Sequence, residues 1–176
     1  IWKSYRIIIS LIRKISYGLN YLHQNQIAHL DIKPKNIIVN LTKRDFKIID
    51  FGFADMSPFT KFLDDIRGTP GYFPKHFESV EYDTWLPEIK ANDFNYTNKR
   101  DYPHLQDSSL VYKIDSYCFG RLLFMLKSIY DEHTEYMCCN LEKNTGDKIN
   151  NIINVLTEND VHKRITIEQL ITDFDL

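Results

Sequence analysis

The sequence contains no long apolar run and no concentrated charge of either sign. No stretch approaches the roughly 20 apolar residues of a membrane-spanning helix, and no signal-peptide pattern is present. Its 22 Lys and Arg residues nearly balance its 24 Asp and Glu residues, which gives a net charge of −2. Without a basic block or stripe, nothing favours binding to nucleic acid or to an anionic membrane. We therefore expect neither nucleic acid nor membrane among the partners.

Cysteine is also scarce. The three cysteines are Cys118, Cys138 and Cys139, of which two are adjacent and one lies in a helical pattern. Such spacing does not make a disulfide framework, so reduced thiols in an intracellular, cytoplasmic protein are expected. The chain of 176 residues is 43% hydrophobic and 14% aromatic, which argues against disorder and predicts one domain with a sizeable core.

A short polar stretch, His29-Leu30-Asp31-Ile32-Lys33-Pro34-Lys35-Asn36, carries the most informative chemistry. Asp31 can accept the proton of an attacking hydroxyl, and Lys33 is a mobile charge that can reach a phosphoryl oxygen. Asn36 offers a neutral oxygen and Asp50 a charged one, and hard cations such as Mg²⁺ prefer oxygen ligands. This inventory fits phosphoryl transfer, which needs positioning and charge neutralisation more than covalent chemistry.

The two candidate metal ligands flank a predicted β-hairpin. Residues 37–39 and 46–49 are apolar, and a polar turn separates them. Such a hairpin brings Asn36 and Asp50 together at one end, and Gly52 allows the chain to turn sharply afterwards. The alternative is a solvated acidic turn beside a hairpin, with no chemistry attached.

These residues resemble the catalytic loop and metal-binding motif of eukaryotic-type protein kinases, H-R-D-x-x-x-x-N followed by D-F-G. The resemblance implies that Asp31 is the catalytic acid, and that Asn36 and Asp50 hold Mg²⁺. Lys33 is the residue typical of serine/threonine kinases, and it would also contact ATP. The motif positions expected to give structural support are His29, Phe51 and Gly52. ATP and Mg²⁺ are the implied cofactors, and a protein with a Ser or Thr hydroxyl is the implied substrate.

Three later segments resemble the same family. Gly68–His76 resembles G-T-x-x-Y-x-A-P-E, which makes Thr69 part of the substrate platform. Asp115, in a stretch similar to D-x-W-x-x-G, would bond backbone N–H groups of the catalytic loop; the alternative is a simple helix N-cap. Arg164 matches the arginine that supports the end of the activation segment.

Tyr117 stands in place of the family's Trp, and the last three residues of Gly68–His76 all differ from A-P-E; the departures at positions 30 and 76 have the clearest consequences. Position 30 is Leu where most kinases have the Arg that grips a phosphorylated activation loop, so activity without such phosphorylation is expected. His76 stands where the glutamate partner of Arg164 is expected. Three alternatives remain: a neutral His76 accepts a hydrogen bond, Glu78 supplies the carboxylate, or Arg164 is solvent-exposed. We favour Glu78, because a charge-assisted bidentate pair is the strongest.

The pattern of apolar residues predicts a mainly α fold. Apolar positions spaced by three and four predict an amphipathic helix over residues 5–23, a buried central helix near 114–126 and another helix over 148–157. Thr166 and Gln169 form a capping box that opens a last helix. Residues 77–113 show no clean period and resemble an insertion, either a bland surface loop or a docking element.

The resemblance covers nearly all of residues 1–176, but only as the C-terminal lobe of a kinase catalytic domain. The sequence contains no G-x-G-x-x-G loop, strand lysine or paired helix glutamate, so we expect a longer polypeptide to supply the N-terminal lobe. Alone, the segment should bind nucleotide poorly. The first hypothesis is an active serine/threonine kinase. The alternatives are a catalytically silent kinase lobe that binds proteins, and a small-molecule kinase.

Overall fold

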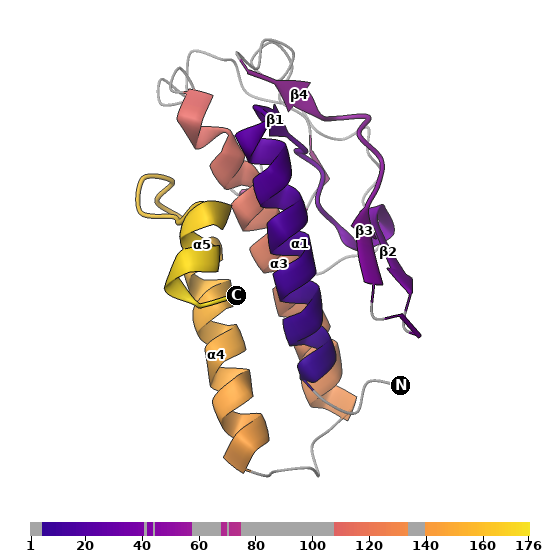
Figure 1. Cartoon of the computed structure of the whole chain (residues 1–176). Coiled ribbons are helices and arrows are strands. Elements are labelled where there is room, and N and C mark those ends of the chain that lie inside the picture. The colour runs from indigo at the N-terminus through magenta and orange to yellow at the C-terminus, as the bar shows by residue number, and fades with distance from the viewer. Residues whose placement is uncertain are drawn as a thin grey trace.

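The computed structural model describes residues 5–40, 42–43, 45–57, 68–69, 71–74, 108–133 and 140–176. Within them the chain is mostly helical, as predicted, and long helices lie side by side with small antiparallel sheets on one flank (Figure 1). The helices are α1 (Arg6–Gln24), α3 (Tyr112–His133), α4 (Asn140–Leu156) and α5 (Ile167–Asp173), with 3-10 turns η1 (Pro34–Asn36) and η5 (Ser108–Leu110). The strands are β1 (Ile27–Ala28), β2 (Ile37–Asn40), β3 (Asp45–Ile48) and β4 (Asp55–Met56).

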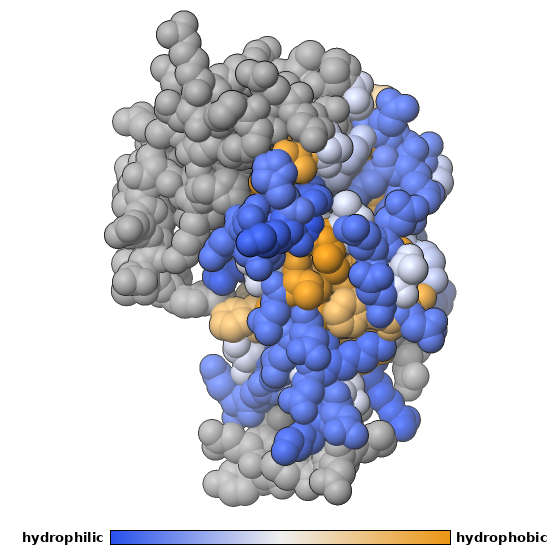
Figure 2. All heavy atoms as spheres, turned by 90° about the vertical axis from the view of Figure 1, so that its left-hand side faces the viewer, coloured by the Kyte–Doolittle hydropathy of each residue, from blue (hydrophilic) through white to orange (hydrophobic). Residues whose placement is uncertain are grey.

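The described surface is polar on one side and partly apolar on another. On the side of α4 and α5, hydrophilic side chains predominate around a limited apolar area (Figure 2). In contrast, large apolar side chains are exposed in the β2–β3 hairpin and in the segment that follows it up to β4, namely Ile38, Phe51, Phe53 and Met56. No helix among the described residues is long and apolar enough to cross a membrane.

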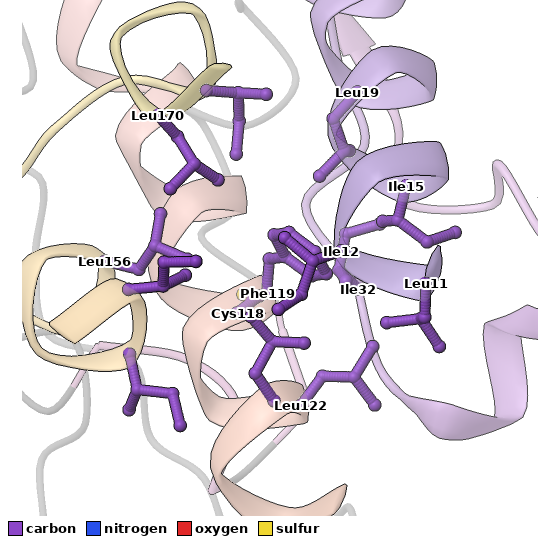
Figure 3. Close-up of a cluster of buried hydrophobic side chains, with 14 of the residues drawn as sticks. Leu11, Ile12, Ile15, Leu19, Ile32, Cys118, Phe119, Leu122, Leu156 and Leu170 are labelled. Carbon is purple, nitrogen blue, oxygen red and sulfur yellow. The ribbon is translucent and has the colours of Figure 1, made fainter. Parts of the chain in front are cut away.

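Helix α1 has the predicted amphipathic pattern, and most of its apolar face is buried. The buried positions include Leu11, Ile12, Ile15 and Leu19. Helix α3 packs against both α1 and α4, and its buried side chains, among them Cys118, Phe119 and Leu122, complete the core between the helices (Figure 3). A Cβ at Gly120 would lie 2.8 Å from Leu156 Cβ, so the close approach of α3 to the end of α4 requires glycine there.

Two helices are longer than the apolar pattern predicted. Helix α4 begins at Asn140 rather than near residue 148, and α3 continues to His133. The extensions are mainly polar, so hydrophobic periodicity marks only the buried part of each helix. At the other end, α3 begins at Tyr112, so Asp115 lies inside its first turn and the N-cap alternative is wrong.

The predicted hairpin is present as strands β2 and β3, which pair antiparallel from Ile37 opposite Ile48 to Asn40 opposite Asp45. One further bond, from Ile49 N to Asn36 O at 2.9 Å, continues the pairing towards Asp50. A second pairing, between β1 and β4, was not predicted because each strand has only two residues. It returns the chain beyond Gly52 to the strand that leads into His29.

The last helix begins as predicted. Thr166 accepts a bond from Gln169 N, and the Gln169 side chain accepts one from Thr166 N, which completes the capping box. Of the segment expected to be an insertion, residues 77–107 lie outside the described residues. Leu110 and Val111 are buried at the start of the helical core.

Candidate active site

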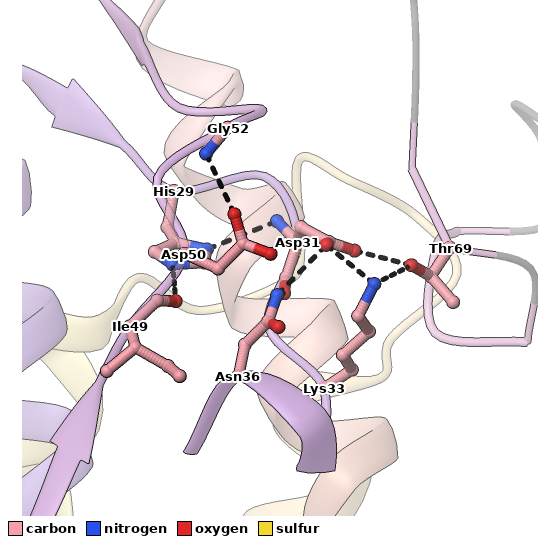
Figure 4. Close-up of polar contacts among 8 residues, drawn as sticks. All are labelled: His29, Asp31, Lys33, Asn36, Ile49, Asp50, Gly52 and Thr69. Atoms are coloured by element: carbon pink, nitrogen blue, oxygen red, sulfur yellow. Dashed lines mark hydrogen bonds and ion pairs between the residues drawn. The ribbon is translucent and has the colours of Figure 1, made fainter. Parts of the chain in front are cut away.

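The carboxylate of Asp31 lies at the centre of the site and is only 5% exposed. Its Oδ1 accepts a hydrogen bond from Thr69 Oγ1 at 2.5 Å, and its Oδ2 lies 2.7 Å from Lys33 Nζ. Asn36 Nδ2 donates to the same Oδ2 at 2.9 Å (Figure 4). Burial of a carboxylate is costly unless its oxygens are bonded, and these three contacts engage both oxygens of Asp31 and fix its direction.

Lys33 connects the loop to the segment that contains Thr69. Its ammonium donates to Thr69 Oγ1 at 2.8 Å while it pairs with Asp31. The three side chains therefore form a closed triangle, although Thr69 is far along the chain from Lys33. The resemblance to serine/threonine kinases implied that Thr69 bonds the acid and the lysine, and the structure shows both bonds.

The Thr69 segment is fixed against α3 by its own contacts. Arg121 Nε donates to Gly71 O at 2.9 Å, and Tyr72 Oη donates to Met125 Sδ at 3.2 Å. Burial raises the pKa of Tyr72, with Arg121 acting in the opposite direction, so the phenol remains protonated as a donor. A Cβ on Gly68 would collide with the ring of buried Phe73, only 2.2 Å away. Close packing therefore holds Thr69 in place.

Asn36 and Asp50 provide the oxygen atoms suited to a metal ion. Asn36 Nδ2 also donates to Asp31 O at 2.8 Å, so the amide nitrogen is committed and Oδ1 remains for a ligand. Asp50 is exposed, and its Oδ1 accepts a bond from Gly52 N at 3.2 Å. Among the described residues, no group of three or more His, Cys, Asp or Glu could hold a metal. The pair fits Mg²⁺, which keeps several waters and shares phosphate oxygens.

His29 joins the catalytic loop to the strand that ends at Asp50. Its Nδ1 accepts a bond from Asp31 N at 3.3 Å, and its Nε2 donates to Ile49 O at 3.1 Å. A carbonyl can only accept, so this geometry assigns the proton to Nε2. The ring also contacts Phe51 edge-on, with 5.0 Å between centroids. Both ring nitrogens are thus bonded to backbone groups, so His29 supports the structure of the loop and does not transfer protons.

The carboxylate of Asp115 supports the loop from below and is completely buried. Oδ1 accepts a bond from Leu30 N at 2.6 Å, and Oδ2 accepts one from His29 N at 2.7 Å. Leu30 has a φ of 64°, a left-handed conformation that costs a non-glycine residue about 1–2 kcal/mol. The two bonds offset that strain just before Asp31.

A third donor to Asp115 was missed from the sequence. His23 Nε2 lies 2.9 Å from Asp115 Oδ2, and the His23 side chain is 10% exposed. Its only signal in the sequence was its position in the last turn of a helix leading into the catalytic loop.

Arg164 lies apart from Asp31 and joins α3 to the loop between α4 and α5. Its guanidinium donates to the backbone oxygens of Glu158 at 2.8 Å, Lys113 at 3.1 Å and Asn159 at 3.4 Å. It also lies 4.8 Å from the Tyr117 ring centroid. Burial lowers the pKa of Arg164 to about 10.

The structure decides one of the three alternatives for Arg164. The residue is only 1% exposed, so the solvent-exposed alternative is wrong. Within the described residues Arg164 forms no ion pair with a carboxylate, and backbone oxygens surround the guanidinium instead. The other two alternatives, His76 and Glu78, lie outside the described residues.

Comparison with known proteins identifies the fold family. The model of the protein kinase domain matches residues 3–174. The chain belongs to the protein kinase family. Smooth-muscle myosin light chain kinase of Gallus gallus is 39% identical over 80 residues, which are 43% of this chain and 4% of that protein. A DNA damage response protein kinase of Saccharomyces cerevisiae is 35% identical over 81 residues, 36% of this chain and 16% of that protein.

A serine/threonine-protein kinase of Caenorhabditis elegans is 40% identical over 67 residues, which are 36% of this chain and 9% of that protein. This kinase chain therefore spans only a small part of the length of these relatives. All three relatives are named as kinases, and the Caenorhabditis elegans protein as a serine/threonine-protein kinase, in agreement with the family that the catalytic-loop residues predicted.

Proposed function

We propose that this chain is the catalytic C-terminal lobe of a serine/threonine protein kinase, which transfers the γ-phosphate of ATP to a protein hydroxyl. The observation that carries the proposal is the closed triangle of Asp31, Lys33 and Thr69. It combines a proton acceptor, a mobile cation and a hydroxyl from the substrate-platform segment in one place. Such a set positions a nucleophile and neutralises charge, which is what phosphoryl transfer requires.

Each residue has a definite part in the proposed reaction. Asp31 accepts the proton of the substrate hydroxyl, since its carboxylate retains lone pairs beyond those occupied by its three partners. Lys33, already beside Asp31, compensates negative charge that develops on the transferred group. Thr69 fixes the orientation of both side chains and so restricts where the hydroxyl can lie.

Asn36 Oδ1 and the Asp50 carboxylate would hold Mg²⁺, which when bound neutralises and orients the phosphates of ATP. Asp50 has a φ of 63°, and the bond from Gly52 N to its Oδ1 supports this conformation. Strained left-handed residues other than glycine are often found at functional sites, and Asp50 is such a residue at a candidate metal ligand.

The exposed apolar side chains near the hairpin support the assignment to one lobe. Phe51, directly after the candidate metal ligand Asp50, is 49% exposed, and exposed apolar patches commonly mark surfaces that another domain or protein covers. A second lobe packed on this area would cover it together with the ATP. The chain 1–176 without that lobe is therefore expected to turn over poorly.

The deciding experiment measures transfer of labelled γ-phosphate by the full-length protein to peptides that offer Ser and Thr, Tyr, or neither. Labelling of the Ser and Thr peptides alone supports the proposal. No labelling of any peptide, together with retained binding to other proteins, favours the silent binding module. Labelling of aminoglycoside or choline instead of peptide favours a small-molecule kinase.

A further inference from the structure

The end of α1 contacts the support of the catalytic loop, and this contact has no role in the reaction described above. We infer that His23 is a positioning residue for Asp31, acting through the carboxylate of Asp115. Its consequence for turnover rests on the proposed kinase function, but its geometry does not. His23 belongs to the last turn of α1, and its Nε2 lies 2.9 Å from Asp115 Oδ2.

His23 is the one side chain among the described residues that donates to Asp115. The remaining two donors are the backbone N–H groups of His29 and Leu30, at 2.7 Å and 2.6 Å. Asp115 has no exposed surface, and no described Lys or Arg forms an ion pair with it. A carboxylate so buried depends on each of its hydrogen bonds, because no water replaces a lost donor.

The third bond determines how the carboxylate is oriented. His23 and His29 N both bond Oδ2, which leaves Oδ1 directed at Leu30 N. Because Leu30 has a left-handed backbone, it keeps this conformation only while its surroundings fix it. Leu30 directly precedes Asp31, so a rotation of the Asp115 carboxylate changes the direction of the catalytic side chain.

The surroundings of His23 allow the hydrogen bond to be separated from packing. The imidazole also contacts the ring of Tyr112, with 4.8 Å between centroids and 42° between planes. His23→Phe keeps a ring against Tyr112 but removes the donor. His23→Gln places an amide N–H near the position of Nε2, whereas the amide of His23→Asn is too short to reach it.

Amide hydrogen exchange of the full-length protein, resolved at His29 and Leu30, tests the contact without any need for activity. His23→Phe and His23→Asn should exchange at these two amides roughly 10-fold faster or more, the effect of one lost bond to a charged group. His23→Gln should stay near wild type. The amide of Ile15 in the middle of α1 is the control and should not change.

Two results would overturn the inference. One is a hydrogen-exchange rate of the Leu30 amide that equals the wild-type rate in either His23→Phe or His23→Asn. The other is an equal increase at Leu30 and Ile15, which would indicate general destabilisation. If His23→Phe does not fold, His23→Asn and His23→Gln still decide between these outcomes.

Kinetics of the same variants test the consequence for Asp31. The expected result is a kcat reduced roughly 10-fold in His23→Phe, with KM for ATP unchanged and kcat restored in His23→Gln. An unchanged kcat in a variant whose Leu30 amide exchanges faster would refute positioning. If the wild-type protein transfers no phosphate, the proposed function fails, and the exchange experiment still decides the role of His23.

Discussion

Replacing the buried Arg164 changes the free energy of unfolding through two opposing effects, the loss of its contacts and the relief of its desolvation. In Arg164→Met, the backbone oxygens of Glu158 and Asn159 lose their donor, at about 1–3 kcal/mol each. The carbonyl of Lys113 lies inside α3 and is less affected. The lost contact with the Tyr117 ring adds about 1 kcal/mol.

Relief of desolvation acts in the opposite direction. Burial lowers the pKa of Arg164 to about 10 from an ordinary value of about 12.5, which corresponds to about 3 kcal/mol at 1.36 kcal/mol per pH unit. Because the pKa is lowered, the unfolded state binds the proton more tightly between those two values. The loss of folding stability caused by burying the charged guanidinium is therefore complete at neutral pH and decreases only above about pH 10. With about 5 kcal/mol lost and about 3 kcal/mol regained, Arg164→Met should be less stable by about 2 kcal/mol.

Urea unfolding of residues 1–176 at pH 7, followed by circular dichroism, measures this difference from the shift in midpoint at constant slope. Arg164→Lys should lie between wild type and Arg164→Met, because a lysine has donors but not the planar fork. Lys163→Met is the matched control, since the Lys163 side chain is 76% exposed in its ion pair with Asp160. A stability of Arg164→Met equal to or above wild type would refute the reasoning and show that the desolvation cost dominates.

Further predictions concern the site. Thr69→Val should lower kcat roughly 10- to 100-fold by removing the bonds to Asp31 and Lys33, whereas Thr69→Ser should retain most activity; equal rates for the two would exclude the hydroxyl. Leu30 is 1% exposed and cannot grip a phosphate, so phosphatase treatment should leave activity unchanged, and a collapse would disprove this. Calorimetry should detect nucleotide-dependent Mg²⁺ binding that Asp50→Ala abolishes; tight binding by that variant would contradict the assignment.

The parts of the fold that depend on local pattern were predicted well. The amphipathic α1, the hairpin of β2 and β3, and the capping box at Thr166 all follow from residue spacing over a few turns. The kinase family itself was recognisable from the order of Asp31, Asn36 and Asp50, because the motif and the strands that flank it agree.

Distant contacts were predictable only where a family motif carried them, as for the bonds from Asp115 to the catalytic loop, and the others were not. The strands β1 and β4 are too short to show an alternating pattern in the sequence. The N-terminal extension of α4 is polar, so no apolar periodicity indicates it. The bond from His23 to Asp115 joins positions 92 residues apart. The backbone oxygens that surround Arg164 have no signature in the sequence at all, since every residue has a carbonyl.

The most direct test of the central claim is the turnover of Asp31→Asn in the full-length protein. Asparagine keeps the size of the side chain but cannot accept the hydroxyl proton, so kcat should fall by about 10²–10⁴. Affinity for ATP should change little, because the Asp31 carboxylate is not one of the candidate metal ligands, and its bond to Asn36 involves Nδ2 rather than the ligand atom Oδ1. A purified Asp31→Asn protein that transfers phosphate to Ser or Thr peptides at the wild-type rate would contradict the account.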